Sequence, residues 1–218
     1  MLKDSERVGL HTFTAIRLLG KGSFGEVFLV QHKATKKHYA LKVLSKQKVF
    51  AQNLMKYVYA ERNVQSMLTH PFVVRMHSAF QTQHKLFLVL DYCPGGDLGH
   101  ILQLEKKFTK DRAKMYLAEI LLAIQELHNS EIVYRDLKPD NIVIDADGHA
   151  LLTDFGLSKE GIKESEYTQS FCGSVAYLAP EVLRKSGHGK SVDWYLLGTL
   201  LYEMLVGIPP YFNRNKYV

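Results

Sequence analysis

The stretch from Tyr134 to Gly156 limits the possible folds more than any other part of the chain. Within it, apolar runs at 142–144 and 151–152 flank an Asp147-Gly148 pair, and an Asp-Gly pair between two such runs indicates a tight β-hairpin. A hairpin brings the polar segments before and after it to the same end of its strands. We therefore expect four polar side chains to share one cleft: Asp136, Lys138, Asn141 and Asp154.

The chemistry of these four side chains suits phosphoryl transfer. Asn141 and Asp154 offer oxygen ligands to a hard cation such as Mg²⁺, which completes its shell with phosphate and water. Asp136 can accept a proton from a hydroxyl group, and Lys138 can neutralise a phosphoryl group during transfer. The alternative interpretation is a chance acidic loop beside a hairpin.

A glycine-rich stretch near the start of the chain also suits phosphate. It reads Gly20-Lys21-Gly22-Ser23-Phe24-Gly25-Glu26-Val27. In a dinucleotide-binding fold this pattern would open a helix, but here the strand-like run Val27-Phe28-Leu29-Val30 follows it. That order favours a β-turn folded over phosphates, where the missing glycine side chains let backbone N–H groups approach.

Lys42 has the apolar neighbours Tyr39, Leu41 and Val43, which indicate a buried strand, and Ala40 beside it leaves room for a flat base. Glu61 follows in a helical stretch at 54–68 and could hold the Lys42 ammonium against the α- and β-phosphates of a nucleotide. The alternative for Lys42 is a plain surface lysine, and its apolar neighbours weaken that alternative.

The remaining pattern predicts two structural units. Short β-type runs lie at 13–19, 26–30, 38–44 and 85–90. Helices dominate after Asp97, and Lys110 to His128 carries apolar residues at helical spacing, Met115 and Leu121 among them, behind a possible N-cap at Thr109. The composition shifts at 91–96, so we expect a β-rich unit of residues 1–91 and a helical unit of residues 92–218.

Composition excludes several classes of function. The net charge is +6, and a basic run from Lys33 to Lys48 contains no acid, but no aromatic–basic interleaving accompanies it. We therefore expect a solvated surface there and no nucleic-acid partner. Cys93 and Cys172 form no C-x-x-C pair, which favours a reduced intracellular compartment. The apolar stretch 194–212 contains Glu203 and a Pro-Pro pair, so a buried helix is expected instead of a membrane span.

Two motifs in order carry a family resemblance. Tyr134-Arg135-Asp136 with Asn141, followed by Asp154-Phe155-Gly156, resembles the catalytic loop and magnesium motif of eukaryotic protein kinases. Further segments resemble the AGC group, which includes cyclic-AMP-dependent kinase, Akt and the ribosomal-protein kinases: His70-Pro71-Phe72, Asp91-Tyr92, Gly95-Gly96-Asp97-Leu98 and Phe171-Cys172-Gly173. The resemblance implies an α+β, two-lobed fold, in which a small antiparallel β-sheet lobe with one helix binds ATP and a larger lobe is mainly helical.

The resemblance also implies an activity and its residues. The chain resembles a serine/threonine kinase that uses ATP and Mg²⁺, with Asp136 as base, Lys138 on the transferred phosphoryl group, Asn141 and Asp154 on the metal, and Lys42 with Glu61 on ATP. The glycine-rich stretch from Gly20 to Val27 would cover the phosphates. The other implied ATP-binding positions are Leu19, Ala40, Leu90, Asp91, Cys93, Asp97, Val143 and Thr153, with the backbone of Asp91 and Cys93 on the adenine edge.

Partners and regulation are implied in the same way. Asp97, Asp140 and Glu203 match acidic positions that hold arginines upstream of the acceptor, so the resemblance implies protein substrates with basic residues before Ser or Thr. Ser170 would be the activating phosphosite of an upstream kinase, with Arg135 and Lys159 around its phosphate. The resemblance further implies a protein that is monomeric in its full length and cytoplasmic, with the nucleus as a second compartment.

The chain departs from the family pattern in three places. Gly173-Ser174-Val175-Ala176 replaces the family's Gly-Thr-Pro-Glu, and Gln65 replaces an apolar residue, where an unpaired buried amide would cost about 1–3 kcal/mol. The chain also ends at Val218, so we expect a piece of a longer kinase, with one flank of the helix at 192–206 uncovered. The alternative functions are a pseudokinase or regulatory ATP-binding module and, from another class, a basic nucleic-acid-binding domain.

Overall fold

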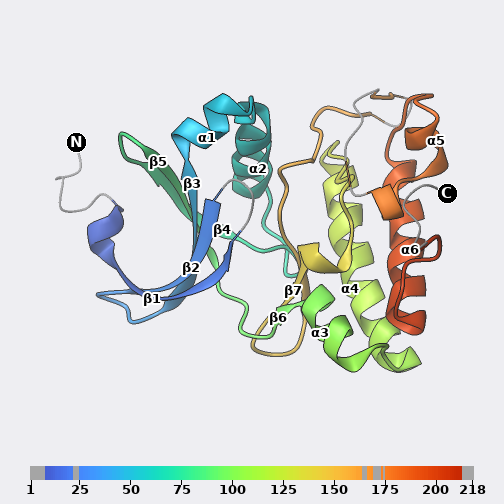
Figure 1. Ribbon diagram of the computed structural model, residues 1–218, viewed down its shortest axis with the longest axis horizontal. Helices are drawn as coiled ribbons and strands as arrows, with labels where there is room; N and C mark the ends of the chain where they lie inside the picture. The colour runs from blue at the N-terminus through green and yellow to red at the C-terminus, as the bar shows by residue number, and fades with distance from the viewer. Residues whose placement is uncertain (1–7, 22–24, 164–165, 169–172, 174, 213–218) are drawn as a thin grey trace.

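The computed structural model describes residues 8–21, 25–163, 166–168, 173 and 175–212 (Figure 1). Three predicted phosphate-loop residues, Gly22, Ser23 and Phe24, lie outside the described residues. The predicted phosphosite Ser170 also lies outside them, as do Cys172 and Ser174.

An antiparallel sheet of five strands forms the N-terminal part of the molecule, in the order β1-β2-β3-β5-β4. Its strands are β1 (Phe13–Lys21), β2 (Gly25–His32), β3 (His38–Ser45), β4 (Met76–Gln81) and β5 (Lys85–Asp91). The four predicted strands are confirmed. The sequence prediction missed β4, because its six residues, Met-His-Ser-Ala-Phe-Gln, do not alternate between apolar and polar types even though their burial does alternate.

Two helices accompany this sheet. Helix α1 (Lys46–Ala51), which the prediction missed, begins where the Ser45 hydroxyl accepts a hydrogen bond from the Lys48 N–H, and it contacts β3. Helix α2 (Met55–Met67) contacts β4 and confirms the predicted helical stretch. Figure 1 shows α2 beside the sheet, on the side that faces the rest of the molecule. A short 3₁₀ turn, Leu10–Thr12, precedes β1.

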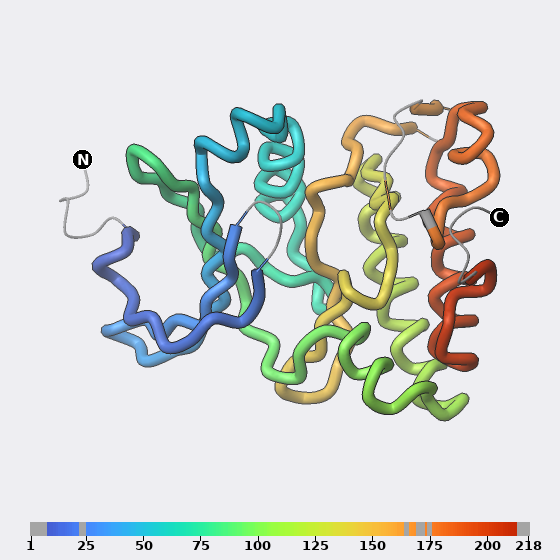
Figure 2. Tube along the Cα trace, viewed as in Figure 1, coloured from blue at the N-terminus to red at the C-terminus, as the bar shows by residue number. Residues whose placement is uncertain are grey.

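A second, smaller sheet contains the predicted hairpin. Its order is β6-β7-β8, with β6 (Gly96–Asp97), β7 (Ile142–Ile144) and β8 (Ala150–Leu152). Gly148 has a φ of 90°, which glycine adopts without the steric cost of a side chain, and Asp145 Oδ1 accepts the N–H groups of Asp147 and His149, each at 2.9 Å. Figure 2 shows the segment after α2 running towards this hairpin, where Val73 bridges Leu152.

Helices make up most of the C-terminal part. They are α3 (Leu98–Glu105), α4 (Lys110–Asn129), α5 (Pro180–Leu183) and α6 (Ser191–Val206), with 3₁₀ turns at Pro139–Asn141 and Val175–Tyr177. Thr109 caps α4 as predicted, because its hydroxyl accepts the Arg112 N–H at 3.4 Å. The predicted helix at 110–128 is confirmed, and its periodic residues Ile120, Ile124 and Leu127 are buried on a helix that packs against α6 and β8. Met115 and Leu121, which belong to the same periodic set, are exposed.

The two faces of α6 differ in their surroundings. Leu196, Leu200 and Met204 are buried against α4 and its neighbours. Four apolar side chains of the same helix are exposed: Trp194, Tyr202, Leu205 and Val206. Among the described helices, α6 included, none combines the length and the hydropathy that crossing a membrane requires.

The sheet with α2 and the helices α3 to α6 lie on opposite sides of a junction that the chain crosses at residues 91–97 (Figure 1). Buried apolar side chains form one large cluster, which fills the helical part and extends to Val64 of α2, and two smaller clusters that include strands of the large sheet. The α+β architecture expected from the sequence is confirmed. The boundary between residues 91 and 92 stays a prediction.

Candidate active site

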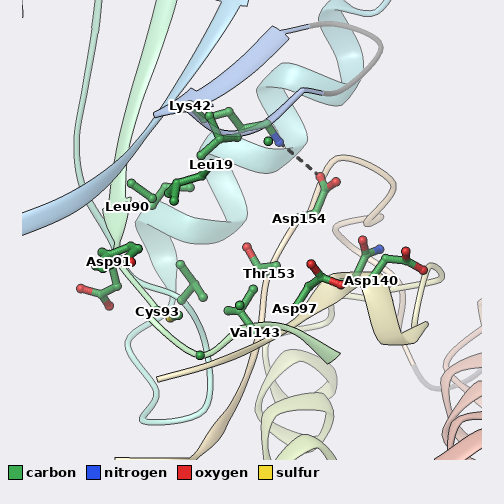
Figure 3. Close-up of a pocket in the computed structure, with 18 of the residues that line it drawn as sticks. Leu19, Lys42, Leu90, Asp91, Cys93, Asp97, Asp140, Val143, Thr153 and Asp154 are labelled. Atoms are coloured by element: carbon green, nitrogen blue, oxygen red, sulfur yellow. Dashed lines mark hydrogen bonds and ion pairs between the residues drawn. The ribbon is translucent and has the colours of Figure 1, made fainter. Parts of the chain in front are cut away.

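A cavity of about 980 Å³ lies between the large sheet and the helical part. Its walls come from β1 to β3, the junction at 91–97 and the hairpin β7–β8 (Figure 3). Sixteen of the predicted site residues line it: Leu19, Gly20, Gly25, Val27, Ala40, Lys42, Glu61, Leu90, Asp91, Cys93, Asp97, Asp140, Asn141, Val143, Thr153 and Asp154. Segments far apart in the sequence therefore meet at one site.

Five predicted residues within the described part of the chain do not line this cavity. Lys21 and Glu26 form an ion pair with each other at 3.2 Å, across the β1–β2 pairing, which directs their side chains to the rim. Asp136 and Lys138 line a neighbouring cavity of about 410 Å³ that shares Lys42 with the first. Glu203 lies on α6 and lines neither cavity.

The inner end of the cavity is apolar. Leu19 and Val27 come from β1 and β2, Ala40 from β3, Leu90 from β5, and Val143 from β7, so both parts of the molecule contribute one wall (Figure 3). Such a slot fits a flat heteroaromatic ring. The sequence analysis missed Val74, Tyr92 and His100 in the lining. Val74 is placed by the hydrogen bond that its N–H donates to the Leu152 carbonyl of the hairpin at 2.9 Å, a contact that no local pattern predicts.

Lys42 holds two carboxylates together at the polar end. Its Nζ lies 2.5 Å from Glu61 Oε1 on α2. It also lies 3.4 Å from Asp154 Oδ1 after β8, the contact drawn as a dashed line in Figure 3. Burial alone would lower the pKa of Lys42, but the two carboxylates together raise it above its ordinary value. The Lys42 ammonium in turn lowers the pKa of Asp154. Both groups therefore stay charged, and the site is built for an anion beside Lys42 and a cation beside Asp154.

The loop before β7 presents Asp136. Its Oδ2 accepts hydrogen bonds from Lys138 Nζ at 3.0 Å and from Asn141 Nδ2 at 2.8 Å. Burial raises the pKa of Asp136, while the charge and hydrogen bond of Lys138 oppose that rise. The result is a fixed carboxylate with a raised affinity for a proton, which suits a general base.

Asp193 on α6 anchors the loop that carries Asp136. Its side chain is fully buried and accepts the N–H groups of Tyr134 at 2.8 Å and Arg135 at 2.7 Å, and it lies 2.8 Å from His128 Nε2. Arg135 has a φ of 71°, a left-handed conformation that these hydrogen bonds help to hold. The sequence analysis did not single out Asp193. The feature of the sequence that could have indicated its role is an aspartate in the first turn of a mainly apolar helix.

Tyr134 connects the loop to the segment that carries Asp154. Its hydroxyl donates to the Thr153 carbonyl at 2.5 Å, and its ring meets the buried Phe155 edge-on at 5.5 Å. Burial raises the pKa of Tyr134, so the hydroxyl remains a donor. Gln65 on α2 is only 2% exposed; its Nε2 reaches the Val74 carbonyl at 3.5 Å, while its Oε1 has no hydrogen-bond partner among the described residues. The predicted unpaired amide is therefore half satisfied.

A sequence model described as "Protein kinase domain" matches residues 13–218. The chain belongs to the protein kinase domain family. A RAC family serine/threonine-protein kinase homolog of Dictyostelium discoideum is 49% identical over 98% of this chain and 48% of the relative. The serine/threonine-protein kinase Sgk1 of Homo sapiens is 50% identical over 93% of this chain and 47% of the relative. The chain thus spans about half the length of these curated relatives.

These matches confirm the predicted protein kinase fold and the resemblance to Akt-like AGC kinases. Within this kinase domain, the predicted substrate positions fall into two groups. Asp97 Oδ1 accepts the His100 N–H at 2.7 Å and so caps α3, and a Cβ on Gly99 would lie 3.3 Å from Asp97 Oδ1 and 3.2 Å from Asp140 Oδ1. A side chain at this position would therefore crowd both carboxylates. Glu203 instead accepts the Tyr177 hydroxyl at 2.7 Å, and burial raises its pKa.

The basic residues expected around the activating phosphate have other contacts in the kinase domain. The Arg135 guanidinium donates to the Leu157 carbonyl from Nε at 2.8 Å and from Nη2 at 2.6 Å. Lys159 exchanges two backbone hydrogen bonds with Val133, each at 2.9 Å. Because Ser170 lies outside the described residues, its role as a phosphosite stays a prediction.

Proposed function

We propose that the protein is an ATP-dependent serine/threonine protein kinase that transfers the γ-phosphate of ATP to protein substrates. One observation carries the proposal: Lys42 joins Glu61 and Asp154 at the polar end of the cavity, beside a loop that presents Asp136, Lys138 and Asn141. Adenine would occupy the apolar slot, with the backbone of Asp91 and Cys93 on its edge. The α- and β-phosphates would then meet Lys42.

Each residue has a distinct proposed role in the transfer. Asp136 takes the proton of the acceptor hydroxyl as the new oxygen–phosphorus bond forms and the bond to the β-phosphate oxygen breaks. Lys138, which already touches Asp136 Oδ2, offsets the negative charge of the phosphoryl group. A lysine beside the proposed base suits phosphoryl transfer to a hydroxyl group better than it suits a protein that only binds the nucleotide.

The donor atoms of the site fit Mg²⁺. Asn141 uses its amide nitrogen to donate to Asp136, which leaves its oxygen as the ligand atom, and the lowered pKa of Asp154 keeps that carboxylate ionised. Two protein oxygens are what Mg²⁺ takes when phosphates supply further ligands. The bound ion would neutralise phosphate charge and orient the γ-phosphoryl group.

Three carboxylates support the proposed preference for basic residues upstream of the acceptor. Asp97 and Asp140 both line the cavity. Burial raises the pKa of the Tyr177 hydroxyl and of the Glu203 carboxyl, and the charge of Asp140 adds to both rises, so Asp140 lies within electrostatic reach of Glu203. A guanidinium bound between carboxylates forms charge-assisted and often bidentate hydrogen bonds. The upstream activating kinase, the monomeric state of the full-length protein and the cytoplasmic or nuclear location stay predictions.

A phosphorylation assay tests the proposal against its main alternative, a regulatory ATP-binding module. The protein is incubated with radiolabelled ATP, Mg²⁺ and a library of Ser- and Thr-containing peptides. Asp136→Asn should keep nucleotide binding and lose at least about a hundredfold in transfer rate, because only the base is removed. Lys42→Met should lose nucleotide binding as well. Equal transfer by the wild type and Asp136→Asn, measured on the same preparation, would contradict a kinase activity of this site.

A further inference from the structure

Asp91, the last residue of β5, is held at three points by β4 and the residue that precedes it. Its backbone N–H donates to the Arg75 carbonyl at 3.0 Å, and its Oδ2 accepts the Arg75 N–H at 3.1 Å. Its Oδ1 lies 2.6 Å from Nε2 of His77. The backbone of Asp91 is thus bonded to Arg75, directly before β4, and its carboxylate contacts both Arg75 and the β4 residue His77, although Asp91 also lines the cavity.

A β-bulge brings His77 to this position. The pairing of β4 with β5 runs from Met76–Leu90 to Ser78–Val89 with a register shift, so His77 is the extra residue between the two pairs. A bulge bends the strand locally and redirects a side chain. Tyr39 supports the redirected imidazole from the other side: the two rings meet edge-on at 4.9 Å, and Tyr39 is the β3 partner of Asp91 in the sheet register.

The energy of this contact is too small to explain it as a stabiliser of the fold. The side chains of His77 and Asp91 are 31% and 38% exposed. Exposed pairs of this kind contribute only about 0–1 kcal/mol to folding. The contact between His77 and Asp91 matters more for the orientation of Asp91, because Asp91 lines the ligand cavity.

We infer that His77 is a positioning residue for the adenine base. Through the Asp91 carboxylate it fixes the Asp91 backbone in the orientation that receives the 6-amino group of adenine. This inference rests on the proposed function, since it requires ATP in the cavity. It adds a residue of β4 that lines neither cavity to the groups that select the nucleotide.

Two substitutions separate the hydrogen bond of His77 from its ring packing. His77→Phe keeps a ring against Tyr39 and removes the donor, whereas His77→Gln removes the ring and keeps an N–H donor. The matched control is His84→Phe, the same change in the connection between β4 and β5, at the far end of the strand pair. Thermal unfolding of each variant checks that it folds.

The ligands are MgATP and the Mg²⁺ complex of purine riboside triphosphate, which lacks only the 6-amino group. Dissociation constants are measured by calorimetry for each protein. His77→Phe should weaken MgATP binding about three- to tenfold, the equivalent of one hydrogen bond, and should change binding of the deamino analogue by no more than about twofold. His77→Gln and His84→Phe should bind both ligands like the wild type.

A double substitution tests the route through the carboxylate. In an Asp91→Ala background, His77→Phe should cause no further loss of MgATP affinity. Unchanged MgATP binding by His77→Phe overturns the inference, and so does an equal loss for both ligands, which would indicate a general effect on the cavity. Failure of the wild type to bind MgATP would instead overturn the proposed function, and the inference with it.

Discussion

At the scale of single residues, Asp136 shows how its neighbours set the chemistry of the site. Burial raises the pKa of Asp136, while the charge and the hydrogen bond of Lys138 oppose that rise. Replacing the lysine would remove only the opposing effect. Loss of the Lys138 charge should therefore raise the pKa of Asp136 and change the pH dependence of turnover.

We predict that Lys138→Ala moves the acidic limb of the kcat profile to higher pH, in addition to lowering kcat. Transfer requires ionised Asp136, so activity falls as the pH drops through the pKa of Asp136, and that pKa rises when the cation is lost. Lys138→Arg keeps the charge and should leave the limb in place. Turnover of the three proteins is measured across about pH 5–8. If kcat falls at the same pH for the wild type and Lys138→Ala, the prediction is contradicted.

A second residue-scale prediction concerns Gln65. Gln65→Leu should increase the free energy of unfolding by about 1 kcal/mol, because it removes a buried carbonyl oxygen that lacks a partner and loses only a long hydrogen bond to Val74. The measurement is urea unfolding. Gln125→Leu, on the exposed face of α4, is the control and should change stability by no more than about 0.5 kcal/mol. A less stable Gln65→Leu variant would mean that the amide is satisfied.

The meeting of the site residues was partly predictable, because a hairpin signal places the segments before and after it at one end, and Asp136, Lys138 and Asp154 do line one cavity. The catalytic, metal-binding and phosphate-binding roles of these residues stay predictions. The bulge at His77 was not predictable. It depends on the register in which β4 and β5 pair. That register is decided by how the side chains of both strands pack, which the sequence of a single strand does not show.

At the scale of elements, α6 does more than fill the core of the helical part. Its buried Asp193 accepts two backbone N–H groups of the catalytic loop and contacts His128 on α4. The sequence analysis predicted a buried apolar helix here, which is correct for one face. It could not find the anchoring role, because the loop lies about sixty residues earlier in the chain, as the separations of 58 and 59 residues show.

We predict that Asp193→Ala lowers the free energy of unfolding by about 3–5 kcal/mol, since it breaks a buried pair and leaves two N–H groups without an acceptor. Asp111→Ala is the control: this aspartate is exposed in the first turn of α4 and should contribute less than about 1 kcal/mol. Urea unfolding followed by circular dichroism compares the variants. Equal stability of the two variants would show that the loop is held by other contacts.

For the molecule as a whole, the exposed apolar side chains of α6 bear on self-association in solution. Trp194, Tyr202, Leu205 and Val206 present apolar surface to solvent on one helix. Contiguous apolar surface of this kind favours association. The sequence analysis predicted an uncovered flank for this helix, and its exposed side chains agree with that expectation.

We predict that the 218-residue chain self-associates through this face as its concentration rises. The double variant Tyr202→Lys with Leu205→Glu should remain monomeric at concentrations where the wild type sediments faster. Leu10→Glu, an equivalent change at an exposed leucine before β1, should associate like the wild type. Sedimentation velocity decides between them, and a monomeric wild type at every concentration would contradict the prediction.

The anchoring of the catalytic loop on α6 has a consequence for how substrates are aligned. Asp193 ties the loop that carries Asp136 to the same rigid helix that carries Glu203. Lys42 and Asp91, by contrast, belong to the large sheet. If the cleft opens or closes, the loop that carries Asp136 should move together with the helix that carries Glu203. The sheet residues Lys42 and Asp91 would move relative to Val143 and Asp154, which line the opposite wall of the same cavity, so closure would bring the two halves of the proposed nucleotide site together.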